Sequence, residues 1–216
     1  MNPRLKICGI RRIQDVEYLN LYVPDYAGFI LSKPFWRYVS PEQMQILHEA
    51  LHPGIRRVGV FVNPELYEIR NYARFLDVIQ LHGEESGEFI KLVRKNFPVL
   101  EIWKAVRVRN PEDIHKADLL PVDQLVLDSF SEHAHGGTGT LAPWDVIVQN
   151  RPEKEFFLAG GISANNIRDA VREVRPFGID VSSSVETDKC KDVSKIREIL
   201  EILQNRSDKN DRNAAG

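Results

Sequence analysis

Short apolar runs alternate with amphipathic stretches along nearly the whole chain. The runs are rich in β-branched residues and almost continuous in apolar character, which is typical of parallel strands that helices cover. They predict eight strands, at Leu5–Cys8, Tyr26–Leu31, Val58–Val62, Val78–His82, Ile102–Val108, Leu125–Ser129, Phe156–Gly160 and Ile179–Ser183.

Apolar residues between these runs recur every three or four positions, which is the spacing of one helix face. The clearest faces are Met44, Leu47 and Leu51; Leu66, Ile69, Ala73 and Leu76; Ile167, Ala170, Val171 and Val174; and Val193, Ile196, Leu200 and Leu203. Three dipeptides place a capping side chain before a proline and so predict helix starts: Ser40-Pro41, Asn63-Pro64 and Asn110-Pro111.

Eight strand–helix units predict an α/β fold, a single (β/α)8 barrel over residues 1–203, with roughly 25 residues per unit. The remaining residues, 204–216, are polar and without periodicity, so we expect a flexible C-terminal tail. The alternative is a doubly wound open sheet, but the glycine-rich turn that binds dinucleotides is missing after the first strand.

Charge and composition narrow the class of protein. The 29 basic and 31 acidic residues give a net charge of −2, which offers no general footprint for nucleic acid or an anionic membrane. No apolar run resembles a signal peptide or a bilayer span, and two cysteines make no disulfide framework. We therefore expect a cytoplasmic protein without nucleic-acid or membrane partners. We also expect a monomer rather than a homodimer.

Polar residues stand at the ends of several predicted strands, where the chemistry of such a barrel is found. Side chains alternate along a strand, so residues two apart share a face. The sets that share a face are Lys6 and Cys8; Gln80 and His82; Val126 and Asp128; and Asp180, Ser182 and Ser184. If the last polar residue of each set faces the barrel mouth, the sets converge on one site.

Three of these residues each have two interpretations. Cys8 is either a small buried hydrophobe or a base, since cationic neighbours such as Lys6 favour a thiolate. Asp128 is either a loop cap or a carboxylic acid whose raised pKa allows it to donate a proton. His82 is either an interior histidine satisfied by hydrogen bonds or a member of the site.

Three clusters of small residues follow the later strands, at His135–Gly139, Ala159–Ser163 and Ser182–Ser184. The loops after the seventh and eighth strands of this fold, with a helix N-terminus, frequently bind phosphate. The second and third clusters therefore predict a phosphate cradle. His133 and His135 have no carboxylate at a convincing ligand spacing, so no metal is expected.

Seven motifs then occur in the order of one family: Lys6-Ile7-Cys8-Gly9-Ile10, Val58-Gly59-Val60-Phe61-Val62-Asn63, Gln80-Leu81-His82-Gly83, Leu127-Asp128-Ser129, Gly136-Gly137-Thr138-Gly139, Leu158-Ala159-Gly160-Gly161 and Gly178-Ile179-Asp180-Val181-Ser182-Ser183. From about Lys6 to Leu203, the chain resembles the phosphoribosylanthranilate isomerases of tryptophan biosynthesis. The first and last motifs are the specific ones.

The resemblance implies a barrel that needs neither cofactor nor metal. Such an enzyme converts N-(5-phosphoribosyl)anthranilate into 1-(2-carboxyphenylamino)-1-deoxyribulose 5-phosphate by an Amadori rearrangement. By motif, the general base falls on Cys8, the general acid on Asp128, and the arginine that holds the anthranilate carboxylate on Arg37. The phosphate-site backbone falls on Gly160, Gly161, Ser183 and Ser184, and His82 and Asp180 complete the predicted substrate-binding residues.

Two other functions stay open at this point. A non-catalytic barrel could bind a sugar phosphate, although pure binding requires neither Cys8 nor Asp128. A related phosphoribosyl isomerase of the histidine pathway also performs an Amadori reaction, but it usually uses two aspartates, and Cys8 occupies the first of those positions.

Overall fold

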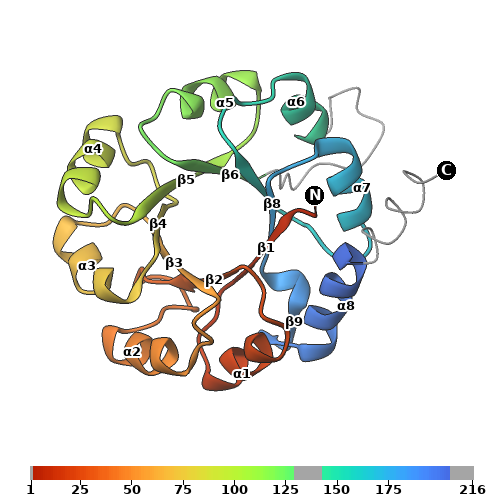
Figure 1. Ribbon diagram of the computed structural model, residues 1–216. Helices are drawn as coiled ribbons and strands as arrows, with labels where there is room; N and C mark the ends of the chain where they lie inside the picture. The colour runs from red at the N-terminus through yellow and green to blue at the C-terminus, as the bar shows by residue number, and fades with distance from the viewer. Residues whose placement is uncertain (1, 129–142, 205–216) are drawn as a thin grey trace.

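The computed structural model describes residues 2–128 and 143–204 and contains a closed barrel of eight parallel strands in chain order (Figure 1). The strands are β1 (Arg4–Cys8), β2 (Tyr26–Ile30), β3 (Arg56–Phe61), β4 (Val78–Leu81), β5 (Glu101–Arg107), β6 (Gln124–Asp128), β7 (Phe156–Ala159) and β8 (Gly178–Val181). All eight predicted strands are present, and their described ends lie within two residues of the prediction. The (β/α)8 fold is confirmed, and the open-sheet alternative is wrong.

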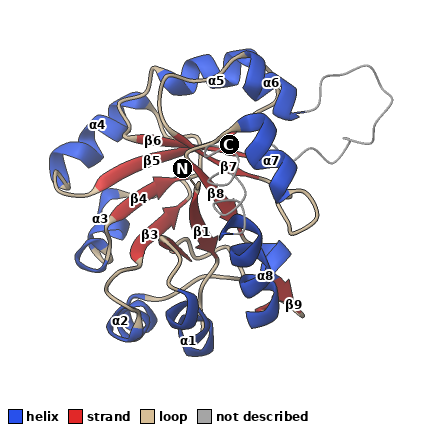
Figure 2. Cartoon of the chain, turned by 45° about the vertical axis from the view of Figure 1, so that its right-hand side comes forward, coloured by secondary structure: helices blue, strands red, loops and turns tan. Residues whose placement is uncertain are grey.

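Helices follow the strands around the outside of the barrel (Figure 2). They are α1 (Ile13–Tyr22), α2 (Pro41–Ala50), α3 (Leu66–Arg70), α4 (Gly87–Asn96), α5 (Pro111–Asp118), α6 (Pro143–Gln149), α7 (Ile167–Val174) and α8 (Val193–Gln204). Two 3-10 turns, η1 (Ala73–Phe75) and η2 (Ser183–Val185), and a short hairpin of β9 (Glu186–Thr187) with β10 (Cys190–Lys191) complete the described elements.

Two of the three predicted helix starts are confirmed. The Ser40 hydroxyl accepts a hydrogen bond from the Gln43 backbone at 3.2 Å, with Pro41 opening α2. Asn110 caps α5 in the same way, accepting from the Asp113 backbone at 3.2 Å. Each cap satisfies one of the backbone donors that the first helical turn leaves open.

The predicted start at Asn63-Pro64 is wrong, because α3 begins at Leu66. Asn63 adopts a left-handed conformation with φ of 46°, and its side chain accepts a hydrogen bond from the Glu84 backbone at 2.7 Å. The side chain thus ties two loops together and does not cap a helix. The apolar period from Leu66 to Leu76 is also broken, since α3 ends at Arg70 and η1 follows it.

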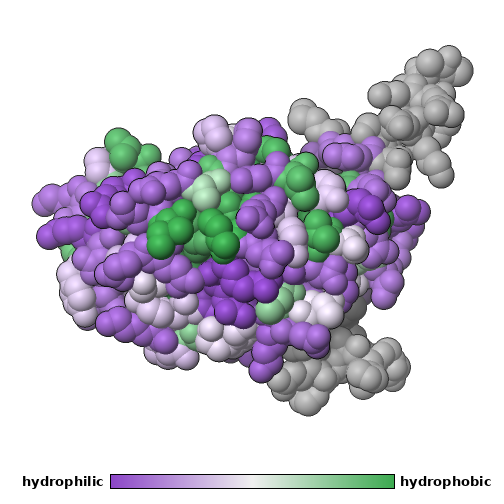
Figure 3. Space-filling view, turned by 90° about the horizontal axis from the view of Figure 1, so that it is seen from below, coloured by the Kyte–Doolittle hydropathy of each residue, from purple (hydrophilic) through white to green (hydrophobic). Residues whose placement is uncertain are grey.

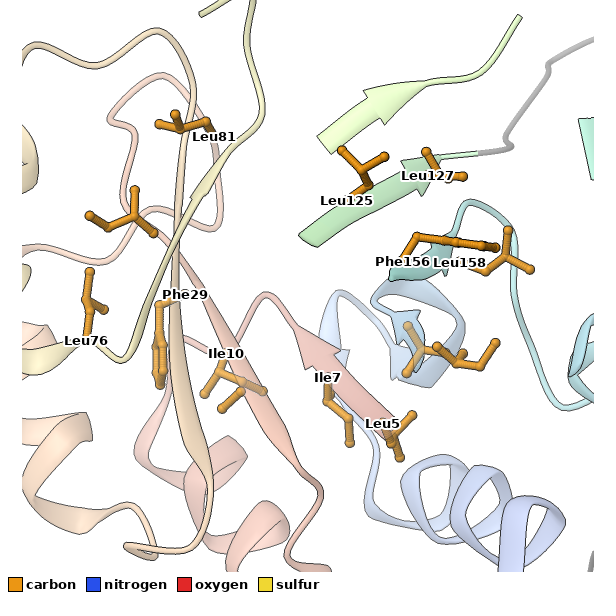
Figure 4. Close-up of a cluster of buried hydrophobic side chains, with 14 of the residues drawn as sticks. Leu5, Ile7, Ile10, Phe29, Leu76, Leu81, Leu125, Leu127, Phe156 and Leu158 are labelled. Carbon is orange, nitrogen blue, oxygen red and sulfur yellow. The ribbon is translucent and has the colours of Figure 1, made fainter. Parts of the chain in front are cut away.

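The core has two parts. Outside the barrel, apolar side chains of the strands pack against the helices, as Figure 4 shows for Leu5, Ile7, Leu125, Leu127 and Phe156 among others. Inside it, a second cluster contains Tyr26, Val58, Val78, Trp103, Ala105, Val126 and Phe157. The Trp103 ring lies 5.0 Å from that of Tyr26 and 4.7 Å from that of Phe157. Because this cluster fills the barrel below the strand ends, space for chemistry lies at the carboxyl ends.

The outer surface is mostly hydrophilic in the view of Figure 3, with apolar residues in small groups. Leu21 of α1 and Ile46 of α2 are among the exposed apolar side chains. Single exposed apolar residues of this kind are ordinary on a globular protein. Within the described residues, no helix has the length and apolar character that crossing a membrane requires.

Candidate active site

The predicted site residues lie at the carboxyl ends of the barrel strands. Cys8 ends β1, Asp128 ends β6 and His82 directly follows β4. A cavity of about 640 Å³ opens beside β4, β5 and β6, and its lining includes His82, Arg107 and Asp128. His82 interacts electrostatically with Asp128, Lys6 and Asp180. The structure thus places charged groups of β1, β6 and β8 within electrostatic reach of His82 at the end of β4.

A buried ion pair lies beneath this space. Lys6 is fully buried inside the barrel, and its Nζ donates to Asp180 Oδ2 at 2.8 Å, across the register of β1 with β8. Burial opposes the charge on Lys6, but Asp180 and Cys8 outweigh it, so the pKa of Lys6 lies above its ordinary value. Asp180 Oδ1 is buried and has no hydrogen-bond partner among the described residues. One carboxylate oxygen thus holds the lysine and the other is left for a donor.

Cys8 is buried beside this pair, with 8% of its surface exposed. Burial raises the pKa of its thiol, because a charged sulfur loses its hydration. Lys6 opposes this shift by its positive charge, and Lys191 adds a second cation. The thiol therefore lies beside a permanent positive charge, which is the arrangement that stabilises a thiolate.

Asp128 and His82 occupy the opposite part of the mouth. Val126 packs in the interior cluster, so Asp128, two residues further along β6, also faces the barrel axis. His82 is exposed at the mouth. The surrounding protein desolvates its imidazole, and with Lys6 nearby this lowers the pKa of His82 below its ordinary value. The ring is therefore neutral at neutral pH and can donate or accept a hydrogen bond.

Arg37 lies in the loop between β2 and α2, close to Gly9, the residue after Cys8. Its guanidinium donates to both carboxylate oxygens of Glu186, at 2.7 and 3.1 Å. It also lies 4.1 Å from the ring centre of Trp36. Gly9, at a φ of 84°, leaves room for the arginine, because a Cβ there would come within 2.7 Å of Arg37 Cδ. Contacts with Glu186, Trp36 and Gly9 thus fix the position of the arginine.

The predicted phosphate cradle lies in the loops after β7 and β8. Gly160 and Gly161 have φ of 84° and 67°, a conformation that glycine adopts without strain. Among the described residues, none accepts a hydrogen bond from the backbone N–H groups of Gly161, Ser183 or Ser184. The Ser184 hydroxyl is likewise buried without a partner in this part of the chain. Open donors of this kind suit an anion.

The family model for N-(5'-phosphoribosyl)anthranilate (PRA) isomerase matches residues 5–202. The chain belongs to this family. A curated relative from Acetivibrio thermocellus, named N-(5'-phosphoribosyl)anthranilate isomerase, is 40% identical over 204 residues, covering 91% of this chain and 93% of the relative. A relative of the same name from Caldanaerobacter subterraneus is 38% identical over 203 residues. The match covers 93% of this chain and 98% of the relative.

Solved structures of PRA isomerases have the same fold. One from Thermotoga maritima is 33% identical with a TM-score of 0.83, and the match covers 94% of this chain and 99% of that one. A second, in complex with reduced 1-(o-carboxyphenylamino)-1-deoxyribulose 5-phosphate, is 32% identical with a TM-score of 0.81 and the same coverage. The resemblance to the family that the motifs predicted is confirmed.

Several residues that the sequence singled out lie outside the described residues. This applies to the motif Gly136–Gly139, to Ser129, and to His133 and His135. Residues 205–216, most of the predicted tail, also lie outside them. In residues 2–128 and 143–204, no three His, Cys, Asp or Glu side chains are grouped in a way that could hold a metal ion.

Sequence reasoning missed two charged residues of the site, Glu186 and Lys191. Both are buried, with 8% and 1% of their side chains exposed, and Lys191 Nζ lies 2.8 Å from Glu186 Oε1. Glu186 follows the cluster Ser182–Ser184 by two residues, but the sequence does not show its partner. Lys189 and Lys191 follow it by three and five residues, and nothing in the sequence indicates which one turns inward.

Proposed function

We propose that Cys8 and Asp128 act as general base and general acid in the isomerisation of N-(5'-phosphoribosyl)anthranilate, the reaction of the family. The observation that carries this assignment is the buried Lys6 cation beside the Cys8 thiol, at the barrel mouth that Asp128 also faces. Membership of the family makes the chain an aldose–ketose isomerase of tryptophan biosynthesis. It favours this activity over a non-catalytic barrel and over the histidine-pathway isomerase.

The chemistry needs one proton delivered and one removed. Asp128 in its neutral form gives a proton to the ribose ring oxygen, the bond between this oxygen and C1' breaks, and the lone pair of the anthranilate nitrogen forms the imine with C1'. The imine acidifies the hydrogen on the neighbouring sugar carbon, C2'. The Cys8 thiolate removes that proton, and the electron pair of the C–H bond forms the enolamine double bond. Protonation at C1' and loss of the hydroxyl proton then give the ketose.

Three contacts hold the substrate in this proposal. The backbone of Gly161, Ser183 and Ser184 binds the phosphate, since their N–H groups are open. Arg37 binds the anthranilate carboxylate, for which its planar fork is suited. Asp180 Oδ1 accepts a hydrogen bond from a sugar hydroxyl, which satisfies a buried oxygen. A family structure that binds a reduced product analogue supports a phosphorylated ligand of this size.

The proposal is tested by following the fluorescence of freshly made N-(5'-phosphoribosyl)anthranilate in the presence of the purified chain. Turnover to the carboxyphenylamino ketose is the expected result. Tight binding of the reduced product analogue without any turnover of the substrate would instead identify a binding protein.

Arg37→Ala is expected to raise KM by about 10- to 100-fold while kcat stays within a few-fold. A hydrogen bond to a charged group contributes roughly 1.5–3 kcal/mol, and each 1.4 kcal/mol corresponds to about tenfold in affinity. Steady-state kinetics over a wide substrate range measure both constants. An unchanged KM would remove Arg37 from the carboxylate site.

The pH dependence follows from the direction of the Cys8 pKa shift. Because burial raises the pKa of the thiol and only the thiolate acts as a base, the fraction of Cys8 in the thiolate form is expected to rise with pH through the alkaline range. Lys6→Met removes the cation that lowers this pKa, so the rise moves to higher pH. The rate of Cys8 alkylation by iodoacetamide should follow the same curve. A shift to lower pH in Lys6→Met would contradict the role of Lys6.

The expectation of a monomer stays a prediction. One solved relative, from Thermotoga maritima, is described as monomers generated from a dimeric enzyme. A monomer and a dimer have thus both been obtained for that relative.

A further inference from the structure

Arg37 is held along one edge by Glu186, the first residue of β9. Arg37 Nη2 donates to Glu186 Oε2 at 2.7 Å, and Nε donates to Oε1 at 3.1 Å. This is the parallel, two-bond geometry that fixes a guanidinium in direction as well as in place. Figure 1 shows β9 beside α8, far along the chain from the loop that carries Arg37.

Glu186 is itself fixed from the other side. Lys191 of β10 donates from Nζ to Glu186 Oε1 at 2.8 Å and to the Ser182 carbonyl at 3.0 Å. A buried carboxylate is costly unless it is paired, and here two cations share it. Burial alone would raise the pKa of Glu186, but its hydrogen bonds with Arg37 and Lys191 hold that pKa below the ordinary value. Glu186 is therefore charged at neutral pH.

The remaining contacts of Arg37 leave one edge open. Trp36 covers one face of the guanidinium at 4.1 Å, and Gly9 lies against the side-chain stem. Nε and one Nη2 hydrogen are used by Glu186, and no other described residue accepts from Nη1. The outer edge, formed by Nη1 and Nη2, has the two parallel donors that a second planar carboxylate requires.

We propose that Glu186 is a positioning residue that orients Arg37 toward the anthranilate carboxylate. It also connects this end of the substrate with the phosphate end, through Lys191 and the Ser182 carbonyl next to Ser183. The inference rests on the proposed role of Arg37 and adds a residue that does not touch the substrate. It explains why a carboxylate is buried next to an arginine that must itself bind a carboxylate: one edge is neutralised and fixed, and the other is presented.

Glu186→Gln tests the inference because it keeps the shape of the side chain and removes its charge. Charge-assisted hydrogen bonds are roughly twice as strong as neutral ones, so KM is expected to rise about tenfold while kcat stays within about twofold. Inhibition by inorganic phosphate, which needs only the cradle, should change little. Glu101→Gln is the matched control, because Glu101 pairs with Arg56 at 2.9 Å at the opposite end of the barrel. It should leave KM unchanged.

The double variant Arg37→Ala/Glu186→Gln distinguishes an effect of Glu186 on the orientation of Arg37 from an effect on packing. If Glu186 acts through Arg37, adding Glu186→Gln to Arg37→Ala should raise KM no further. Arg37→Lys gives a second test that leaves the Glu186–Lys191 pair intact. A lysine keeps the charge but cannot serve two carboxylates along separate edges, so its KM should approach that of Arg37→Ala.

The outcomes that overturn the inference differ from those that overturn the proposed function. An equal rise in KM on adding Glu186→Gln to the wild type and to Arg37→Ala would show that Glu186 acts through packing. An unchanged KM in Glu186→Gln, or a wild-type KM in Arg37→Lys, would reject the positioning role while Arg37 keeps its own. An unchanged KM in Arg37→Ala would reject both.

Discussion

Cys8→Ala is expected to lower kcat by about 10²- to 10⁴-fold, the range typical of a general base. This corresponds to roughly 3–5 kcal/mol of barrier at 1.36 kcal/mol per tenfold. Affinity for a reduced product analogue should stay within a few-fold, since the thiolate contributes when the proton is removed and little to ground-state binding. Alanine also leaves Lys6 and Asp180 in place, so the electrostatic surroundings change only at the sulfur.

The measurement is steady-state turnover of purified protein together with titration of the analogue. Cys190→Ala is the matched control, because Cys190 is the other cysteine of the chain and lies on β10, outside the barrel. It should retain wild-type turnover. A wild-type rate in Cys8→Ala would show that another group removes the proton.

Asp128→Asn is expected to lower kcat by a comparable factor, about 10²- to 10⁴-fold. An amide has nearly the same shape as a carboxylic acid, but it has no acidic proton to deliver to the ring oxygen. The affinity for the reduced product analogue should again change little. The analogue is already ring-opened, so no ring oxygen has to be protonated.

Asp123→Asn provides the control on the same side of the barrel. Asp123 precedes β6 at the far end of that strand and accepts from the Ile102 backbone and from Arg94, each at 2.7 Å. Its replacement affects packing between strands and not the mouth, so kcat should be retained. Full turnover by Asp128→Asn would place the general acid elsewhere, and an equal loss in Asp123→Asn would attribute the effect to the fold.

The barrel could be predicted because its strands are recognisable one at a time. A parallel strand covered by helices is apolar on both faces, so runs such as Leu125–Leu127 stand out without knowledge of their neighbours. The caps at Ser40 and Asn110 were equally readable, since they act within four residues. Asn63-Pro64 has the same local signal, but a contact with the Glu84 backbone, 21 residues away, decides its conformation.

The site residues likewise divide into those that local sequence patterns indicate and those that depend on contacts between distant segments. Alternation along each strand grouped Cys8 with Lys6, Asp128 with Val126 and Asp180 with Ser182, but the ion pair of Lys6 with Asp180 depends on the register of β1 with β8, which the sequence does not show. Glu186 could not be assigned, because its role depends on Arg37, 149 residues away. Nothing in the sequence shows that a two-residue strand folds back against the loop after β2. Pairings between loops are therefore where the sequence prediction ends.

The division of labour between Cys8 and Asp128 is the central claim, and substrate deuterated at C2' tests it most directly. A C–D bond breaks more slowly than a C–H bond, so the isotope slows only the step that Cys8 catalyses. In Cys8→Ala, proton removal limits the rate, and residual turnover should show a large primary isotope effect. In Asp128→Asn, ring opening limits the rate, and the effect should fall to nearly none. The reverse pattern, a large effect in Asp128→Asn and none in Cys8→Ala, would contradict the assignment of base and acid.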